Sequence, residues 1–415
     1  MNYKILFLLL FTLEHIYQLV LNIVQHRSAG NPTPANVADV YDPATYQNWR
    51  AYHGEKSRLS ILRTVVSWVL TMALLALGFH AWATSLFPAG VFMQLLAVIL
   101  AQTLVETVVY LPFAWVDTMV IEQKYGFNRS TVKTFVIDQV RSFLIEVVLG
   151  VILMGLLALI HRAMGDWVVV LFTGAVFALT LAISFLYGPV FSRLGNKFVP
   201  LEDGELKDKL LALLTKHGYQ VKAIEVMDAS RRTTKLNAYF TGFGKLKSIV
   251  LFDNLLNAMS TDEIVAVFAH ELGHGLNKDV LKQQIMNLGN LLLMAIAVWL
   301  TVRTPVMHEA FGFAAVNYGF AFVLLGGLLG LIQPLTGMAM NAFSRYAEYR
   351  ADAQAVKEGY GAAMITALKK LARDNFAHLA PSRINVVLEY SHPPLSERIA
   401  AVEKLLDETE SKEAE

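Results

Sequence analysis

The chain has 415 residues, of which 55% are hydrophobic and only 17% charged, and its formal net charge is +1. Soluble globular proteins have about 25% charged residues, so this composition favours a membrane protein, and the small net charge excludes the basic footprint of a nucleic-acid-binding protein. The chain has no cysteine, which excludes disulfides, cysteine nucleophiles and thiolate metal ligands and leaves His, Asp and Glu for any metal site.

Long apolar runs along the chain each approach or exceed the roughly 20 helical residues that cross the ~30 Å hydrocarbon core of a bilayer. Lys4 before the first run is compatible with a signal peptide. However, Glu14 and His15 follow that run without a small-residue cleavage site, which favours a retained helix. The predicted spans are 4–22, 61–84, 91–114, 136–160, 167–190, 284–302 and 312–338.

Basic residues are unevenly distributed between the two sides of these spans. With seven spans, the side of the N-terminus has only Lys4, Arg162 and Arg303, and most other Lys and Arg residues near the spans fall on the opposite side. The positive-inside rule therefore predicts that the N-terminus is outside and that the basic side is cytoplasmic.

Two polar segments remain on the basic side. The first is expected to contain a helix over 204–217, strands over 223–227 and 248–252, and a helix that begins near Thr261. Ser260–Thr261 supplies its cap and Glu263 is the capping-box partner. The second begins with a helix and ends in an acidic tail that we expect to be disordered. The predicted division is 1–191 (five spans), 192–283 (first part of a soluble domain), 284–340 (two spans) and 341–415 (second part and tail).

The sequence AHELGHGLNKD has His270 and His274 four residues apart, with Glu271 between them. Residues i and i+4 of a helix share a face, so both imidazoles can reach one metal ion. Glu271 is rotated away from the pair but can still contact a metal-bound water and take its proton during attack on a peptide carbonyl. The alternative is two histidines that merely pack on a helix face, but an accidental HExxH is rare.

A catalytic zinc takes three protein ligands and leaves one position open, so a third ligand must come from elsewhere. Asp279 follows the histidines too closely along the chain, and Glu309 falls on the sparsely charged outer side. Glu348 is favoured over His392 because the hairpin of the last two spans returns it to the side of the histidines. Asp352 follows at i+4, the spacing of a carboxylate that orients a ligand histidine. An ordinary salt-bridged surface helix is the alternative for this segment.

Three motifs together, HELGH, SRYAEYRAD and HPPLSER, resemble those of the integral-membrane CAAX prenyl proteases of the zinc type (type 1) and, more distantly, of the HtpX-type membrane proteases. The resemblance extends to EQKYGFNRST at 122–131, to NAYFTGFGKLKSIVLFDNLL at 237–256 and to the two spans between the zinc motifs. HtpX-like chains are shorter and have fewer spans, so seven spans favour the prenyl protease branch.

The resemblance implies a predominantly α fold, in which a bundle of seven transmembrane helices encloses a chamber that a small α+β gluzincin-like domain closes. It also implies one zinc ion per chain. For residues 237–238 a structural strand, and for residue 392 a surface histidine, are the alternatives. The implied roles are zinc ligands for His270, His274 and Glu348, catalytic glutamate for Glu271, orienting carboxylate for Asp352, oxyanion-stabilising histidine for His392, and substrate binding for Asn237, Ala238 and Arg398.

The expected reaction is hydrolysis of a peptide bond by zinc-activated water. The resemblance implies that the substrate is a protein ending in a prenylated Cys-a-a-X, which loses its last three residues. One alternative is a general quality-control protease of membrane proteins that does not require prenylation, and another is a transporter or channel with a structural zinc site. The protease domain is expected on the cytoplasmic side of a bacterial inner membrane or of the endoplasmic reticulum. The sequence indicates no oligomeric state.

Overall fold

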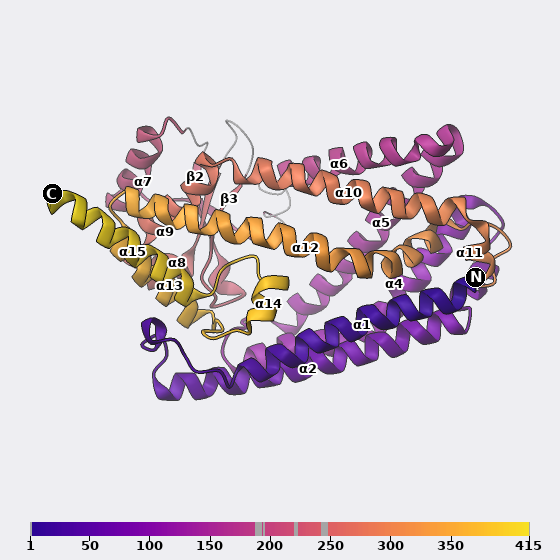
Figure 1. Cartoon of the computed structure of the whole chain (residues 1–415), viewed down its shortest axis with the longest axis horizontal. Helices are drawn as coiled ribbons and strands as arrows, with labels where there is room; N and C mark the ends of the chain where they lie inside the picture. Colours follow the sequence, from indigo (N-terminus) through magenta and orange to yellow (C-terminus); the bar gives the residue numbers. More distant parts are fainter. Residues whose placement is uncertain (1, 187–192, 194–195, 220–222, 242–247, 415) are drawn as a thin grey trace.

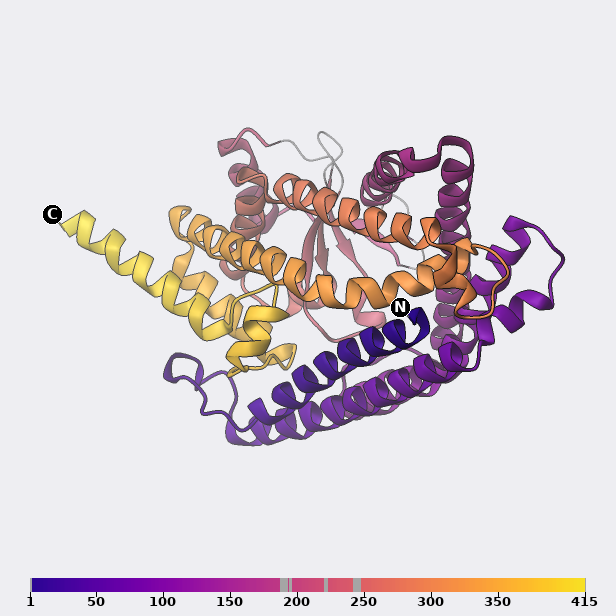
Figure 2. The same ribbon diagram turned by 45° about the vertical axis from the view of Figure 1, so that its right-hand side comes forward.

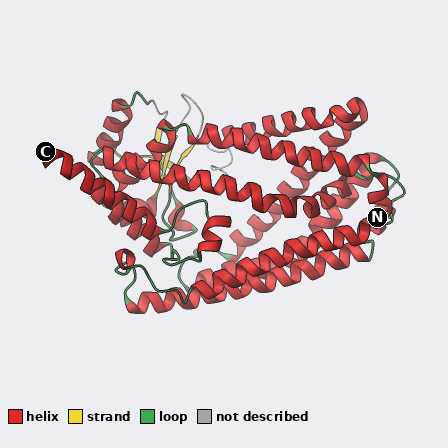
Figure 3. Cartoon of the chain, in the orientation of Figure 1, coloured by secondary structure: helices red, strands yellow, loops and turns green. Residues whose placement is uncertain are grey.

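The computed structural model describes residues 2–414 except 187–192, 194–195, 220–222 and 242–247. Within these residues the chain is predominantly helical, as predicted, with one small sheet near one end of an elongated molecule (Figure 1, Figure 3). Long helices fill the rest of the molecule.

The long helices and the short helices that connect them make up most of the elongated part. They are α1 (Tyr3–Ser28), α2 (Pro43–Ala76), α3 (Phe79–Ser85), α4 (Val91–Trp115), the π-helical η2 (Val116–Glu122) that continues α4, α5 (Val132–Met164), the 3-10 turn η3 (Gly165–Trp167), α6 (Val168–Leu186), α10 (Asp279–Arg303), α11 (Pro305–Glu309) and α12 (Tyr318–Lys357).

Shorter elements form the end that holds the sheet. They are η1 (Ala35–Val37), β1 (Phe198–Pro200), α7 (Glu205–Lys216), β2 (Ala223–Met227), η5 (Ala229–Arg231), β3 (Ala238–Thr241), β4 (Ser248–Phe252), α8 (Asp253–Ala258), α9 (Thr261–Leu276), α13 (Gly361–Asp374), α14 (Arg383–Leu388) and α15 (Leu395–Ala414). The predicted helix over 204–217 and both predicted strands are therefore confirmed.

Six helical stretches among the described residues are long and apolar enough to cross a membrane. The predicted count of seven spans is not confirmed, because the fourth stretch, Val132–Ser184, contains both α5 and α6. A straight helix of its 53 residues would measure about 80 Å, far more than a hydrocarbon core. Gly165 between α5 and α6 has φ 58 and interrupts the helix. This length favours two crossings, but the count of seven stays a prediction.

The second predicted span, 61–84, has the wrong bounds. α2 begins at Pro43, with Asp42 as its N-cap, and ends at Ala76. Gly78 then adopts φ 67 and α3 follows as a separate helix. Glycine reaches positive φ without the steric cost of a Cβ atom, so the chain breaks here although the apolar run continues.

The termini of the long helices gather at two ends of the molecule. The N-terminus and α11 lie at one end, and α9, α13 and α15 lie at the other (Figure 1). α1 and α2 lie side by side in both views (Figure 1, Figure 2), and α10 packs against α12 and α6. The hairpin of α10 and α12 thus starts and finishes at the end that holds the sheet, as the sequence predicts.

The sheet has the strand order β1-β2-β4-β3. β2 and β4 are parallel, and the two outer strands are antiparallel to their neighbours. Ala238 in β3 pairs with Leu251 in β4, and no other described strand pairs with the outer edge of β3. β3 is therefore an edge strand, and it contacts α9.

A single hydrophobic core joins this sheet to α7, α9, α13 and α15. It is formed by residues from both polar segments, such as Leu210, Leu272 and Ile399, and also by residues that precede or begin α2, such as Tyr41 and Trp49. The predicted division leaves residues 35–49 with the spans, whereas their side chains pack into the core of the other end. Tyr41 Oη donates to the carbonyls of Ala372 and Ala377, which fixes this segment there.

The acidic tail differs from the expected disorder, because α15 continues to Ala414. Most of residues 401–414 are Glu, Lys, Ala and Leu, which are good helix formers, and Lys404 lies 3.8 Å from Glu408 one turn later. Composition alone cannot separate such a solvated helix from a disordered tail.

Candidate metal centre

α9 presents the two histidines of the HELGH motif on one face. The helix starts with a complete capping box, in which Ser260 accepts from the Glu263 N–H and the Glu263 carboxylate accepts from the Ser260 N–H, as predicted. Its apolar face is buried, and the imidazole rings of His270 and His274 have centroids 4.8 Å apart. The local sequence therefore fixes the relative positions of the two imidazoles.

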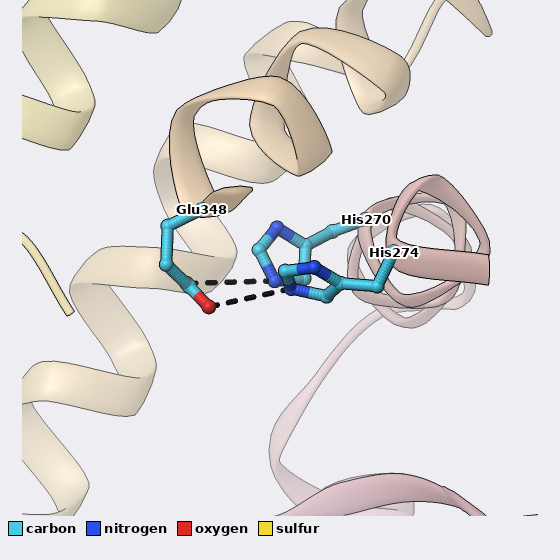
Figure 4. A group of neighbouring side chains, drawn as sticks. All are labelled: His270, His274 and Glu348. Carbon is cyan, nitrogen blue, oxygen red and sulfur yellow. Dashed lines mark ion pairs between the residues drawn. The ribbon is translucent and has the colours of Figure 1, made fainter. Parts of the chain in front are cut away.

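α12 brings Glu348 to the same point. Its two carboxylate oxygens lie 3.3 Å from His274 Nε2 and 3.7 Å from His270 Nε2 (Figure 4). One ligand atom from each of the three residues lies within 4.8 Å of the others. The three side chains thus meet as predicted, from two helices that are far apart in the sequence.

Glycine at position 273 makes this meeting possible. A Cβ atom at Gly273 would lie 2.9 Å from Ala351 Cα and 3.0 Å from Gln354 Cβ, so the backbones of α9 and α12 cross here almost in contact. Glu348 lies one turn before Ala351 on α12 and is buried. The close crossing therefore sets the short distance between Glu348 and the histidines.

Two further carboxylates orient the imidazoles. Asp352 Oδ1 lies 2.8 Å from His270 Nδ1, and Asp279 Oδ2 lies 3.1 Å from His274 Nδ1. A carboxylate that accepts the Nδ1–H leaves the lone pair on Nε2, and both Nε2 atoms face Glu348. This arrangement is typical of histidines that bind a metal.

The donor set fits a divalent cation such as zinc. Two imidazole nitrogens and a carboxylate converge, and Glu348 Oε2 is buried without a hydrogen-bond partner in the structure. Arg398 Nη1 lies 3.2 Å from this oxygen but does not satisfy it with a hydrogen bond. This buried oxygen has ion pairs but no hydrogen bond, so it can still bind a cation.

Two arginines hold the orienting carboxylates. Arg398 contacts Asp352 through Nε at 2.8 Å and Nη2 at 2.6 Å, and Arg350 Nη2 lies 2.5 Å from Asp279. Arg398 is a predicted substrate-binding residue, and in the structure it pairs with Asp352, the carboxylate behind His270. Its predicted contact with substrate stays untested.

Asp279 and Arg350 are not among the functional residues predicted from the sequence, where Asp279 is weighed only as a third ligand. Lys278, between α9 and α10, has φ 55, and this left-handed residue turns the chain so that Asp279 faces back to His274. The available signal was a carboxylate five residues after the second histidine. Whether this carboxylate reaches His274 depends on the turn at Lys278, which the HELGH motif does not specify.

Of the other predicted residues, Glu271 lies between the two histidines in the sequence of α9 and His392 contacts Glu348, whereas Asn237 and Ala238 lie at the start of β3. Glu271 is partly buried, and no described side chain makes a hydrogen bond or ion pair with it, so its carboxylate is available to water. His392 Nε2 lies 3.4 Å from Glu348 Oε1, and its side chain is 63% exposed. Asn237 is exposed and Ala238 begins the edge strand β3. The roles of these four residues stay predictions.

Electrostatics at the site favour a bound cation. Burial lowers the pKa of His274, but its hydrogen bond to Glu348 and the charges of Glu348 and Glu271 raise the pKa overall, to about 9. The neighbouring carboxylates thus attract positive charge, which a proton supplies in the absence of metal. Metal binding must displace this proton, because a histidine ligand is neutral.

Both halves of this chain match known protein families. A family model described as the CAAX prenyl protease N-terminal region, with five membrane helices, matches residues 5–197, and a model of peptidase family M48 matches residues 200–406. The chain is 31% identical over 405 residues to "CAAX prenyl protease 1 homolog" of Oryza sativa subsp. japonica, covering 94% of this chain and 95% of the relative.

Similarity also extends to a fungal relative and to a solved structure. The chain is 30% identical over 411 residues to "CAAX prenyl protease 1" of Saccharomyces cerevisiae, covering 89% and 88% of the two chains. The crystal structure of S. mikatae Ste24p superposes with a TM-score of 0.90 at 27% identity, covering 96% of this chain and 99% of the other. The similarity therefore spans the whole fold and is not confined to the HELGH motif.

Proposed function

The chain belongs to peptidase family M48, with the membrane-helix region of the CAAX prenyl proteases, and we propose that the metal of this membrane metalloprotease is zinc. We also propose that it removes the last three residues of prenylated CAAX proteins. The observation that carries the zinc assignment is the convergence of His270, His274 and Glu348, with a carboxylate behind each imidazole. The relatives that carry the name CAAX prenyl protease support the substrate class.

Each residue of the site has a distinct part in this proposal. A zinc ion held by His270, His274 and Glu348 would lower the pKa of a water molecule and polarise the peptide carbonyl. Glu271 accepts the proton of the attacking water and delivers it to the leaving amine, which suits a carboxylate that no described side chain holds by a hydrogen bond. Asp352 and Asp279 accept the Nδ1–H of the two imidazoles, which orients each ring and leaves the lone pair for the metal on Nε2.

His392 and β3 would bind the reacting peptide. His392 Nε2, close to Glu348 and largely exposed, can donate a hydrogen bond to the carbonyl oxygen as negative charge develops there. An extended peptide could add to the open edge of β3 through main-chain hydrogen bonds near Asn237 and Ala238. Arg398 would then act on the site through Asp352, to which it is paired.

The membrane arrangement suits a lipid-bearing substrate. The prenyl group could remain in hydrocarbon while the peptide enters water at the end of the molecule that holds α9. We assign residues 192–283 and 341–415 to the protease domain and place it on the cytoplasmic side, where the basic loops fall. The chamber predicted between the spans belongs to the same proposal.

The substitution Glu271→Gln tests the mechanism. Purified Glu271→Gln protein should retain one zinc per chain, because the ligands are untouched, and should lose at least 100-fold in peptide hydrolysis, as expected when a general base is removed. His274→Ala serves as the matched comparison, because it should lose both metal and hydrolysis. Unchanged hydrolysis by the Glu271→Gln protein would exclude the proposed mechanism.

A pair of peptides tests the substrate class. A farnesylated CAAX peptide should be cleaved with a much higher kcat/KM than the same peptide without the lipid, and the product should lack three residues by mass spectrometry. Equal turnover of the two peptides would instead favour a general quality-control protease with the same chemistry.

A further inference from the structure

The motif EQKYGFNRST at 122–131 lies between two membrane helices and contributes no residue to the metal centre. It begins at Glu122, the last residue of the π-helical η2. π-helical turns are rare and are frequently found at functional sites. Several contacts of this motif are with residues 232–235, just before β3.

The backbone of the motif pairs with the segment that precedes β3. Asn128 forms an antiparallel β-bridge with Thr233, and the N–H of Arg129 donates to the carbonyl of Arg232 at 3.0 Å. The N–H of Thr234 donates to the carbonyl of Phe127 at 3.2 Å. A loop between two membrane helices thus forms a short ladder with the chain that leads into the edge strand.

A side-chain contact reinforces this ladder. Lys235 Nζ lies 3.2 Å from Glu122 Oε2 and 5.0 Å from the centroid of the Phe127 ring. The Glu122 side chain is only 14% exposed, and it also accepts from Tyr52 Oη at 2.6 Å and from Lys56 Nζ at 3.0 Å. Glu122 is therefore fixed by α2, and it in turn fixes Lys235.

The opposite side of the same segment is held by the protease end. Asn254 Nδ2 donates to the carbonyls of Thr233 and Lys235, both at 3.0 Å. The N–H of Leu236 donates to Asn375 Oδ1 at 3.0 Å, and the Leu236 side chain is buried. Residues 233–236 are thus held from two sides, immediately before the exposed Asn237 and the first residue of β3.

We propose that Lys235 and Glu122 are positioning residues for the substrate peptide, because they fix the start of β3 so that its open edge is ordered before a peptide pairs with it. The inference rests on the proposed function, in which a peptide adds to this edge. Strand addition needs main-chain groups in register, and a segment that must be ordered on binding weakens binding by the entropy it loses. The membrane loop therefore supports the peptide-binding edge.

The substitution Lys235→Met removes the link and keeps most of the side-chain volume. The KM for a cleaved CAAX peptide should rise about tenfold, while kcat changes less than about twofold, because the metal centre is not touched. In Lys235→Arg the KM should stay close to the wild-type value, because Arg can also pair with Glu122 and stack on Phe127. Binding of the same peptide to a Glu271→Gln background reports the dissociation constant directly.

The control is Lys124→Met in the same motif. Lys124 Nζ lies 2.6 Å from Glu55 on α2, and none of its described contacts is with residues 232–238, so the KM should not change. An unchanged KM in Lys235→Met, an equal rise in Lys124→Met, or a fall in kcat alone would overturn the proposal. Failure of the proposed function is distinct, because wild-type protein with full metal content would then not hydrolyse the peptide.

Discussion

At the scale of single residues, the site consists of three candidate ligands, two carboxylates behind the imidazoles and two arginines behind those carboxylates. The arginines restrict the rotamers of the carboxylates, and the carboxylates restrict the orientation of the imidazole rings. The ring nitrogens therefore keep their direction without metal. The two outer pairs differ in exposure, because the side chains of Asp279 and Arg350 are 7% and 24% exposed and those of Asp352 and Arg398 are 1% and 12% exposed. The Asp279–Arg350 pair is therefore the easier one to change without unfolding the chain.

Substitution of Asp279 should weaken metal binding. Asp279→Asn removes the charge that orients His274 and that pairs with Arg350, and losses of about 10-fold to 100-fold in metal affinity are typical of such outer partners. Competition with a chromogenic chelator measures the zinc affinity. Asp262→Asn is the matched control, because Asp262 lies in the first turn of α9 and its described ion pair is with Lys209, outside the metal centre. Equal affinities of the two variants would show that Asp279 does not support the ligand.

At the scale of elements, the decisive feature is the crossing of α9 and α12. The capping box starts α9 at a defined residue, which fixes the rotation of the histidine face. α12 runs from the apolar part of the molecule into the protease end without interruption, although it contains Pro334. The distances between Glu348 and the two histidines therefore depend on how closely these two helices pack.

Substitution of Gly273 should disrupt the crossing. The Cβ atom in Gly273→Ala would meet the backbone at Ala351, so the helices must separate, which is expected to cost about 1–3 kcal/mol and to move Glu348 from the histidines. Zinc content and melting temperature should both fall. In Gly289→Ala on α10, the new Cβ has no atom within 4 Å, so stability should be kept or slightly raised. Normal zinc content in the Gly273→Ala protein would contradict this account.

At the scale of the whole molecule, the long helices separate two ends that should face different compartments. The end with the N-terminus and α11 has few basic residues, and the other end has the basic loops, α9 and the sheet (Figure 1). The positive-inside rule then predicts that the metal centre is cytoplasmic. The orientation matters for function because a CAAX terminus would have to be reached from that side.

Single cysteines can test this orientation directly, because the chain has none of its own. Ala89→Cys, in the loop before α4, should react with a membrane-impermeant maleimide added to intact bacterial cells that express the protein in the inner membrane. Asp203→Cys, before α7, should react only after the membrane is opened. Both residues are exposed, so accessibility should depend on sidedness alone. The reverse labelling pattern would show that the predicted orientation is wrong.

Features that depend on a local residue pattern could be predicted from the amino-acid sequence. Long apolar runs predicted membrane helices, Ser260 and Glu263 predicted the start of α9, and the spacing of His270 and His274 predicted a shared ligand face. These features were predictable because helix periodicity and capping involve residues only a few positions apart. Glu348 was found because a hairpin of two spans restricts where the chain can return.

The contacts between distant parts of the chain could not be predicted from the sequence and are seen only in the tertiary structure. The pairing of Asp279 with His274, of Arg398 with Asp352, and of the 122–131 loop with the start of β3 depends on turns at positive φ and on helix crossings. No periodic pattern encodes such contacts, because they arise only when separate elements pack against one another. The break at Gly78 has the same origin, since an apolar run permits a helix but does not require one to continue.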